Sequence, residues 1–365
     1  MTVKTQKNTR KAISFITLIF FLLGVSAFAL QEEKISTLSD YLYKKDLAKY
    51  EEAKAGPDNQ QKADAMAALI KERPISRILL YAATDYIRCA AKIAGNNSDK
   101  LISMAQTLSD LIPTDAEIQA EAKYIPVGLD DFKKQHLAPS RQLVQRTLAD
   151  AYLQKKDFAK AAEYAEKAYA ISPDKQLVQT LFGLYTQLGN EAKIMSYGQK
   201  MLQQFSMKEK EGYTTALQLA DIYLKKQDMK SATQLFSKLM DAYGNSVPPG
   251  MQEANWNSTR AVAYTLMAQD AYTKQNYTKA EQLYQKVLTF DSRRDDAYYY
   301  LGMCRWKAKD QAGAIVYFAR CMVLNKTLAS KAKQYLDQLF KAEYPNAEEG
   351  DLEKIINQAR SDLRI

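Results

Sequence analysis

Residues 267–287, MAQDAYTKQNYTKAEQLYQKV, are followed 34 positions later by a stretch of the same pattern, LGMCRWKAKDQAGAIVYFARC, over 301–321. Large apolar, small and aromatic residues return at fixed offsets, so that Tyr284, for example, corresponds to Phe318. Two antiparallel helices need this pattern if they are to pack closely and then stack on a copy of themselves. The stretch therefore predicts an all-α architecture of repeated helical hairpins.

Three further windows upstream carry the same arrangement, beginning near Gln142. Small residues in these windows allow two helix axes to approach to about 8–10 Å. The second window fits least well, because Ile194 stands where a small residue is expected. The matching residues are Leu148, Ala149, Tyr152, Ala161, Ala168 and Pro173, then Leu181, Tyr185, Gly189 and Tyr197, then Leu219, Ala220, Tyr223, Ala232 and Phe236.

These five windows resemble the tetratricopeptide repeat (TPR), in which small and aromatic residues hold each hairpin together. The resemblance implies an α-solenoid with an array of about five units over 142–328. Residues 80–113 form a candidate divergent unit within an N-terminal helical region over 30–140. The chain is also similar to exported TPR proteins of Gram-negative bacteria, which implies a scaffold that binds a protein or peptide.

In TPR proteins the first helix of each hairpin lines a concave face. The resemblance therefore implies a partner-binding groove at nine positions: Asp150, Leu153, Asp221, Leu224, Gln269, Tyr272, Tyr299, Met303 and Trp306. The best known sites of the family hold a terminal carboxylate with Lys, Arg and Asn. Here Arg146 is the one basic groove residue and no groove Asn occurs, so this type of recognition is disfavoured. For Tyr299 and Trp306, packing against the next helix or a C-terminal cap is an equal alternative.

The two ends of the chain have their own patterns. A basic start is followed by an apolar stretch, Ile13–Val25, and by the small-x-small sequence Ala27-Phe28-Ala29. This predicts a signal peptide over 1–29 that is cleaved after Ala29, and an uncleaved membrane anchor over 12–30 is the alternative. At the other end, 329–365 are expected to form capping helices. The last has an apolar stripe made by Leu352, Ile355, Ile356, Ala359 and Leu363.

Composition and motifs offer little for a reaction. The chain has 51 basic and 42 acidic residues, interspersed without long runs, and nothing supports a nucleic-acid site. His136 is the only histidine and lies in a polar stretch that is typical of the surface. Cys304 and Cys321 are either a disulfide or two buried thiols. No metal site, cofactor or catalytic residue is predicted.

The sequence thus predicts an exported, non-enzymatic interaction scaffold in the periplasm or elsewhere in the cell envelope. Its partner is a protein or peptide whose identity the sequence does not give, and a membrane contact is expected only if residues 1–29 remain attached. Two alternatives stay open. One is a membrane-anchored assembly factor, and the other is a cell-wall hydrolase that uses acidic residues of the N-terminal helical region.

Overall fold

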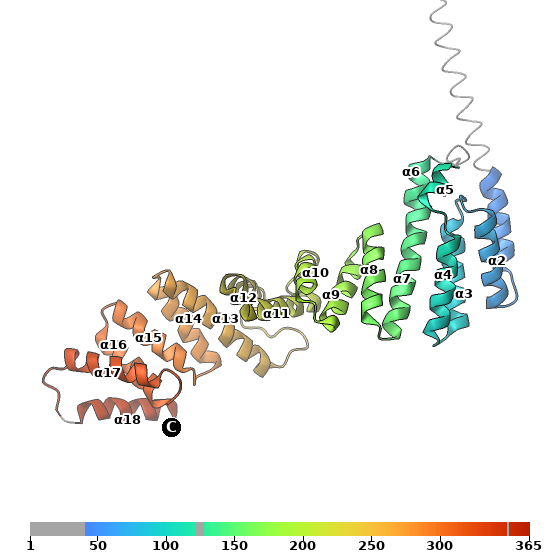
Figure 1. The fold of residues 1–365 in the computed structure, drawn as a ribbon. Coiled ribbons are helices and arrows are strands. Elements are labelled where there is room, and N and C mark those ends of the chain that lie inside the picture. The colour runs from blue at the N-terminus through green and yellow to red at the C-terminus, as the bar shows by residue number, and fades with distance from the viewer. Residues whose placement is uncertain (1–40, 121–127, 349) are drawn as a thin grey trace, which may run out of the picture. The chain divides into compact units, whose positions relative to one another are not determined.

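The computed structural model of the chain describes residues 41–120, 128–348 and 350–365. Within these ranges the regular elements are helices, and no strand occurs (Figure 1). The all-α class with repeated hairpins, predicted from the 34-residue periodicity, is confirmed. The predicted signal peptide over 1–29 lies outside the described residues.

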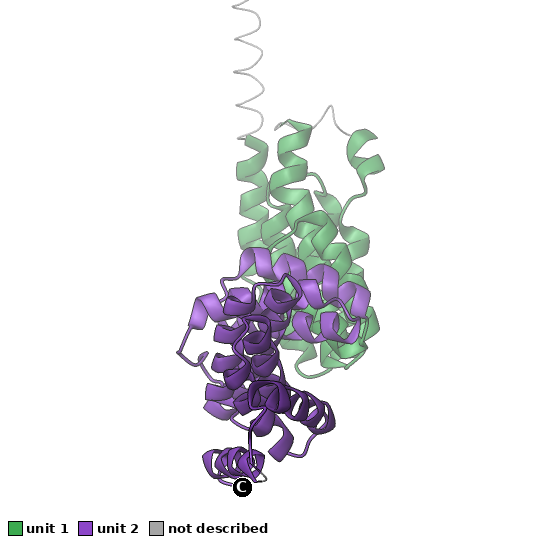
Figure 2. Cartoon of the chain, turned by 90° about the vertical axis from the view of Figure 1, so that its left-hand side faces the viewer, with its two compact units in different colours: residues 1–190 green, residues 191–365 purple. Residues whose placement is uncertain are grey.

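The chain divides into two compact units, residues 1–190 and residues 191–365 (Figure 2). The division comes after α9 (Lys175–Leu188) and before α10 (Glu191–Gln204), inside the second of the five windows. That window carries Ile194, a large side chain at a place where close packing of two helices favours a small one. The five predicted hairpins are therefore shared between the two units.

In the first unit, the described part starts with a helix over 41–54. The elements that follow are α2 (Asn59–Glu72), α3 (Leu79–Ala94), α4 (Ser98–Leu111), α5 (Asp115–Ala120), α6 (Leu129–Phe132), the π-helix η2 (Lys133–Leu137), α7 (Ala138–Gln154), α8 (Phe158–Ile171) and α9. Helix α2 packs on α3, α4 packs on α7, and α7 packs on α8. Leu79, Leu108 and Val144 are buried where these helices meet.

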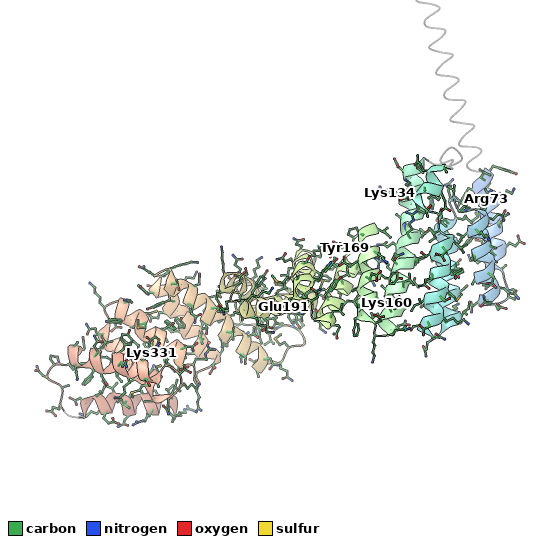
Figure 3. The ribbon with its side chains drawn as sticks, viewed as in Figure 1. Arg73, Lys134, Lys160, Tyr169, Glu191 and Lys331 are labelled. Carbon is green, nitrogen blue, oxygen red and sulfur yellow. The ribbon has the colours of Figure 1, made fainter. Side chains whose placement is uncertain are left out.

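The second unit contains α10 and six further helices that form hairpins, followed by two C-terminal helices. They are α11 (Lys210–Lys225), α12 (Met229–Tyr243), α13 (Glu253–Thr273), α14 (Tyr277–Phe290), α15 (Asp295–Lys307), α16 (Gln311–Val323), α17 (Ala329–Glu343) and α18 (Asp351–Leu363). Each helix from α10 to α16 packs on the next one along the chain. Exposed charged side chains such as Glu191 and Lys331 project from this stack, as Lys160 does in the first unit (Figure 3).

One turn geometry joins the two helices in four of the hairpins. A non-glycine residue adopts a left-handed conformation with φ between 59° and 65°, and these residues are Lys156, Gln227, Gln275 and Lys309. The following residue caps the second helix, because its side-chain oxygen accepts a hydrogen bond from the N–H three positions on. The capping residues are Asp157, Asp228, Asn276 and Asp310. The periodicity of the sequence is thus also a periodicity of backbone conformation.

Small residues lie where helices approach most closely. Ala161, Ala280 and Ala314, which occupy equivalent positions in three hairpins, are fully buried. Gly302 on α15 faces Phe318 on α16, and a Cβ at position 302 would lie 2.9 Å from two ring carbons. A side chain of any size would therefore push the two helices of this hairpin apart.

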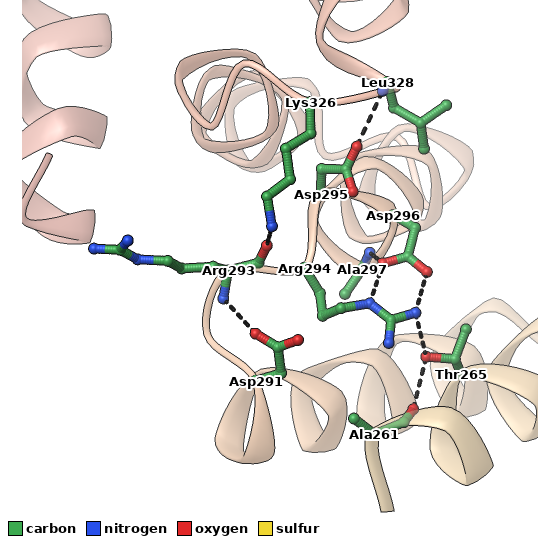
Figure 4. Close-up of polar contacts among 10 residues, drawn as sticks. All are labelled: Ala261, Thr265, Asp291, Arg293, Arg294, Asp295, Asp296, Ala297, Lys326 and Leu328. Carbon is green, nitrogen blue, oxygen red and sulfur yellow. Dashed lines mark hydrogen bonds and ion pairs between the residues drawn. The ribbon is translucent and has the colours of Figure 1, made fainter. Parts of the chain in front are cut away.

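Polar contacts join the start of α15 to its neighbours on both sides (Figure 4). The guanidinium group of Arg294 donates to Asp296 at 2.8 and 2.5 Å, and also to Oγ1 of Thr265 on α13 at 3.3 Å. On the other side, the backbone N–H of Leu328, just before α17, donates to Oδ2 of Asp295 at 3.0 Å. These contacts connect three successive first helices.

Helix α18 packs on α16 at the end of the second unit. Ile356 and Ala359 of its apolar stripe are 8% and 3% exposed, and the other stripe residues pack against the same core while keeping part of their surface in solvent. Arg320 of α16 and Asp362 of α18 form an ion pair of 2.6 Å beside this contact. The stripe predicted from the sequence therefore faces the protein.

Helix α3 begins at Leu79, directly after a turn that polar contacts hold in place. Ser76 donates its hydroxyl to the buried carboxylate of Asp46, which also pairs with Arg73 at 2.9 Å. The N–H of Ile78 donates to Oγ of Ser76 at 3.3 Å. These polar contacts hold the segment before α3 in a turn. The spacing of apolar residues in the sequence does not predict such contacts.

Candidate protein-binding surface

Aromatic side chains connect three first helices of the second unit. This set, the first-helix aromatic cluster, consists of Tyr272 on α13, Tyr299, Tyr300 and Trp306 on α15, and Tyr335 on α17. Ring centroids lie 5.3 Å apart for Tyr272 and Tyr300, 6.1 Å for Tyr299 and Tyr335, and 5.4 Å for Trp306 and Tyr335. All five side chains are half-buried, so the cluster is at once part of the packing and part of the surface.

The phenol groups of Tyr272 and Tyr299 stay protonated at physiological pH. Burial raises the pKa of Tyr272 and that of Tyr299 to about 12, and the neighbouring phenols add to the effect. A hydrogen bond between Tyr299 and Tyr335 raises the pKa of Tyr299 further. Neutral phenols both donate and accept hydrogen bonds, so the cluster can offer both to the amide groups of a polypeptide.

Tyr299 and Trp306 do pack against the next helix, as the alternative to a groove position predicts, but this contact covers only part of each side chain. Both rings contact Tyr335 of α17, and Met303 packs against the same core. Each of these side chains nevertheless keeps part of its surface in solvent. Packing and accessibility therefore coexist at these positions.

The other predicted groove residues are spread over both units. Gln269 on α13 is exposed, Leu224 on α11 is half-buried, and Asp221 on α11 pairs with Lys225 at 2.7 Å. Asp150 and Leu153 lie on α7 in the first unit, where both are exposed, Leu153 by 39%. The structure thus brings together the aromatic residues of α13 and α15, and places the two α7 residues in the other unit.

The basic groove residue Arg146 is engaged within the fold. Its guanidinium group forms an ion pair with Asp174, the residue that caps α9. Asp150 lies one turn further along α7, and although its side chain reaches solvent, partial burial raises the pKa of its carboxyl group while the charge of Arg146 opposes this shift. A cation that already neutralises a helix cap is a poor clamp for a terminal carboxylate.

Two members of the cluster, Tyr300 and Tyr335, were not predicted from the sequence. Tyr335 lies 34 residues after Leu301, so extending the repeat by one further period indicates this position. Tyr300 stacks on Tyr284 of α14, with parallel rings 5.4 Å apart, and meets Tyr272 with its edge. It therefore joins the second helix of one hairpin to the first helix of the next, a role that a single-helix pattern does not reveal.

The interpretation of His136 as a surface residue was wrong. His136 lies in η2 and is half-buried, with its ring 5.7 Å from that of the fully buried Phe132. Its Nδ1 atom is buried and has no hydrogen-bond partner. Burial lowers the pKa of the imidazole, and the charge of Arg77 lowers it further.

Among the described residues, no group of His, Cys, Asp and Glu could hold a metal ion, and no helix is long and apolar enough to cross a membrane. Cys89, Cys304 and Cys321 are buried free thiols, so the disulfide considered for the last two is absent. Burial raises the pKa of Cys304 and Cys321 to about 12, with nearby acidic groups adding to the shift. Such thiols are poor nucleophiles because the thiolate is the reactive form.

The stacked antiparallel hairpins place this chain among the helical-repeat proteins. A model of the tetratricopeptide repeat family matches residues 143–175, and a second model with the same description matches residues 265–321. These segments coincide with the α7–α8 hairpin and with α13 to α16. The chain thus contains tetratricopeptide repeats in these segments, and such repeats are typical of scaffolds for protein–protein interaction.

Individual relatives are distant. Tetratricopeptide repeat protein 21B of Xenopus laevis is 27% identical over 94 residues, which are 26% of this chain and only 7% of that protein. A tetratricopeptide repeat protein from Parabacteroides merdae is 13% identical, with coverage of 82% of this chain and 98% of that one and a TM-score of 0.31. Yeast Tom70 is 17% identical, covering 90% and 63%, with a TM-score of 0.32. TM-scores this low carry no inference about function.

Proposed function

We propose that this protein is a non-enzymatic scaffold that binds a segment of a protein partner on the first helices of its hairpins. The observation that carries the proposal is the first-helix aromatic cluster, in which partly exposed Tyr and Trp side chains meet across α13, α15 and α17. Aromatic side chains supply large contact area at a small cost in conformational entropy, and they dominate many protein interfaces.

The proposed surface of the second unit includes Asp221, Leu224, Gln269 and Met303 together with the cluster, and Asp150 and Leu153 form a separate first-helix patch in the first unit. An exposed carboxylate in each of these patches favours a partner segment that carries basic as well as apolar residues. Neutral phenol groups in the cluster are suited to the backbone amides of an extended segment. The partner would thus be selected by apolar contacts and oriented by charge.

We place this scaffold in the envelope of a Gram-negative cell. The basis is the sequence of residues 1–29, with its basic start, its apolar stretch and the small-x-small site that ends at Ala29. N-terminal sequencing of the protein purified from its own cells tests the location, because cleavage leaves Leu30 as the first residue. Retention of Met1 or Thr2 in a membrane fraction would instead support the anchored alternative.

The binding surface is tested by photocrosslinking in the native cell. A benzoylphenylalanine at Gln269, exposed on the first helix α13, is expected to capture a partner. The matched control is the same substitution at Gln285, which is exposed on the second helix α14 of the same hairpin. Capture at Gln285 but not at Gln269 would contradict a first-helix surface.

A further inference from the structure

A pocket lies at the C-terminal end of the second unit, where a loop joins α17 to α18 (Figure 1). Its volume is about 510 Å³, within the range of about 300–1,000 Å³ that is usual for small-ligand sites. The residues that line it come from the last turn of α17, from the loop and from the first two turns of α18. None of these residues belongs to the first-helix aromatic cluster, so the pocket is a surface of its own.

The pocket begins where a proline stops α17. Pro345 has no N–H to continue the helix, and it disfavours the helical conformation of the residue before it. Tyr344 accordingly has φ of −122° and ψ of 67°, outside the helical region. The chain then turns, with the N–H of Ala347 donating to the carbonyl of Tyr344 at 3.1 Å, and Gly350 with φ of 101° leads into α18. The end of α17, the turn and the start of α18 form three sides of the pocket.

Three side chains make much of the lining apolar. Phe340 is 9% exposed and Ile355 is half-buried, and both pack in the core that α16, α17 and α18 share. Tyr344 is 41% exposed, with its ring centroid 5.2 Å from that of Phe340 and its ring inclined by 45°. The ring of Tyr344 is thus supported from one side by a second ring, while part of its surface remains open to a ligand.

The carboxylate of Glu343 gives the pocket its charge. Glu343 is exposed, and its carboxylate forms no hydrogen bond or ion pair with another described residue. The other acidic residue of the lining, Asp351, is engaged, because it pairs with Lys354 at 2.8 Å and accepts from the N–H of Glu348 at 2.9 Å. Lys341 is exposed on α17 and does not line the pocket. The free carboxylate also lies at the C-terminal end of a helix, where the peptide dipoles favour a cation.

An arginine side chain suits these features better than a lysine. A guanidinium group stacks on aromatic rings and pairs with a carboxylate through two parallel N–H groups, whereas an ammonium group is a strongly hydrated point charge. Asn346 also lines the pocket, and its exposed amide oxygen can accept a further N–H. The apolar part of the lining favours an aliphatic residue next to the arginine.

We propose that this pocket binds an arginine of a partner polypeptide together with a neighbouring aliphatic residue. The guanidinium group stacks on the open part of the Tyr344 ring and donates to the carboxylate of Glu343, while the aliphatic side chain covers Phe340 and Ile355. This site goes beyond the proposed function, because it uses no residue of the first-helix surface. A chain that captures no partner through Gln269 would still bind arginine here.

Blocked dipeptides test the pocket directly. In a methyl spectrum of the full chain, the δ1 methyl signal of Ile355 is assigned through its loss in Ile355→Val. At pH 7 and constant ionic strength, N-acetyl-leucyl-arginine amide is expected to shift this signal in a saturable way and to leave that of Ile222 on α11 in place. The citrulline analogue, which has a similar shape and no charge, should give no saturable shift. The lysine analogue should bind about 2- to 5-fold more weakly, the factor of one exposed cation–π contact.

Substitutions at exposed positions complete the test. Glu343→Gln should weaken binding of the arginine dipeptide about 5- to 10-fold, between the value of an exposed ion pair and that of a hydrogen bond to a charged group. Glu348→Gln is the matched control, because Glu348 is an exposed acid of the same loop that does not line the pocket. It should change the affinity by at most about 2-fold at physiological salt. Tyr344→Leu should remove the preference for arginine over lysine.

Several results would overturn the proposal, and none of them depends on the partner of the first-helix surface. They are the absence of a saturable shift with the arginine dipeptide, an equal shift with the citrulline analogue, and equal affinity for the lysine analogue. An effect of Glu348→Gln as large as that of Glu343→Gln would likewise reduce the binding to general electrostatic attraction.

Discussion

Gly302 and Phe318 are in contact across the hairpin of α15 and α16, with no room for even a methyl group between them. A Cβ at position 302 would lie 2.9 Å from the ring, and the ring is fully buried, so it has little freedom to move aside. The small residue of the repeat pattern is therefore a requirement of packing in this hairpin.

Gly302→Ala is expected to lower the free energy of unfolding by about 1–3 kcal/mol, the usual cost of overpacking a core. Gly183→Ala is the matched control, since Gly183 lies inside α9 with nothing within 4 Å of the added Cβ. There the better helix propensity of alanine should stabilise by about 0.5–1 kcal/mol. Urea unfolding followed by circular dichroism measures both, and a stabilised Gly302→Ala would contradict the contact.

The left-handed turn residues give a second prediction. Gln275 has φ of 60° immediately before the capping residue Asn276. A left-handed conformation costs a non-glycine residue about 1–2 kcal/mol, and glycine avoids this cost. Part of the resulting gain in stability is lost because glycine is more flexible in the unfolded chain. Gln275→Gly should thus raise the free energy of unfolding by up to about 1 kcal/mol. Asn276→Ala should lower it by about 0.5–2 kcal/mol in the same assay.

The two tryptophans should respond differently to removal. Trp256 is fully buried, so Trp256→Ala is expected to cost about 3–5 kcal/mol of stability. Trp306 is half-buried and packs on Tyr335, so Trp306→Ala should cost roughly 1–2 kcal/mol, close to the value of an aromatic pair. The Trp306 variant should also lose crosslinking through Gln269 while it remains folded. If the Trp306→Ala variant is instead unfolded at 25 °C, the role of Trp306 is packing alone.

The thiols give a prediction about reactivity. Because Cys304 and Cys321 are buried and the pKa of each is raised to about 12, neither should react with Ellman's reagent at pH 8 in the folded protein. Adding guanidinium chloride should release three reactive thiols, the number of cysteines in the chain. Release of only one thiol would indicate a disulfide.

The pH dependence of stability should contain a contribution from His136. The folded state lowers the pKa of this group below its ordinary value of 6.5, so between the two values the unfolded chain binds more protons. The free energy of unfolding should therefore rise with pH through this window and become independent of His136 above about pH 7. His136→Asn should remove this contribution, so that the free energy of unfolding of the variant depends less on pH. Urea titrations of both proteins between pH 5 and 8 measure the change.

The sequence predicts the hairpins well because each pair of helices is defined by local apolar periodicity and by small residues at the crossings. Four of the five windows coincide with packed pairs of helices, α7–α8, α11–α12, α13–α14 and α15–α16. The aromatic cluster is only partly predictable, since Tyr300 and Tyr335 act between hairpins. The residue pattern of one helix does not indicate which aromatic side chain of the neighbouring hairpin contacts it.

Other features depend on contacts between segments that are distant in the sequence. The start of α3 at Leu79 follows from the contact of Ser76 with Asp46, 30 residues earlier. His136 is half-buried in a pocket that Tyr43 and Arg77, far earlier in the chain, also line. Neither the burial of one histidine nor the partner of one serine could be obtained from composition or spacing.

The distribution of the rare side chains gives each half of the molecule its own built-in signal. Both tryptophans belong to the second unit, and the only histidine belongs to the first. Tryptophan fluorescence, excited selectively over that of tyrosine, therefore reports on residues 191–365 alone, while the imidazole resonance reports on residues 1–190. Whether the two halves melt in one step or in two can be decided on a single unlabelled sample.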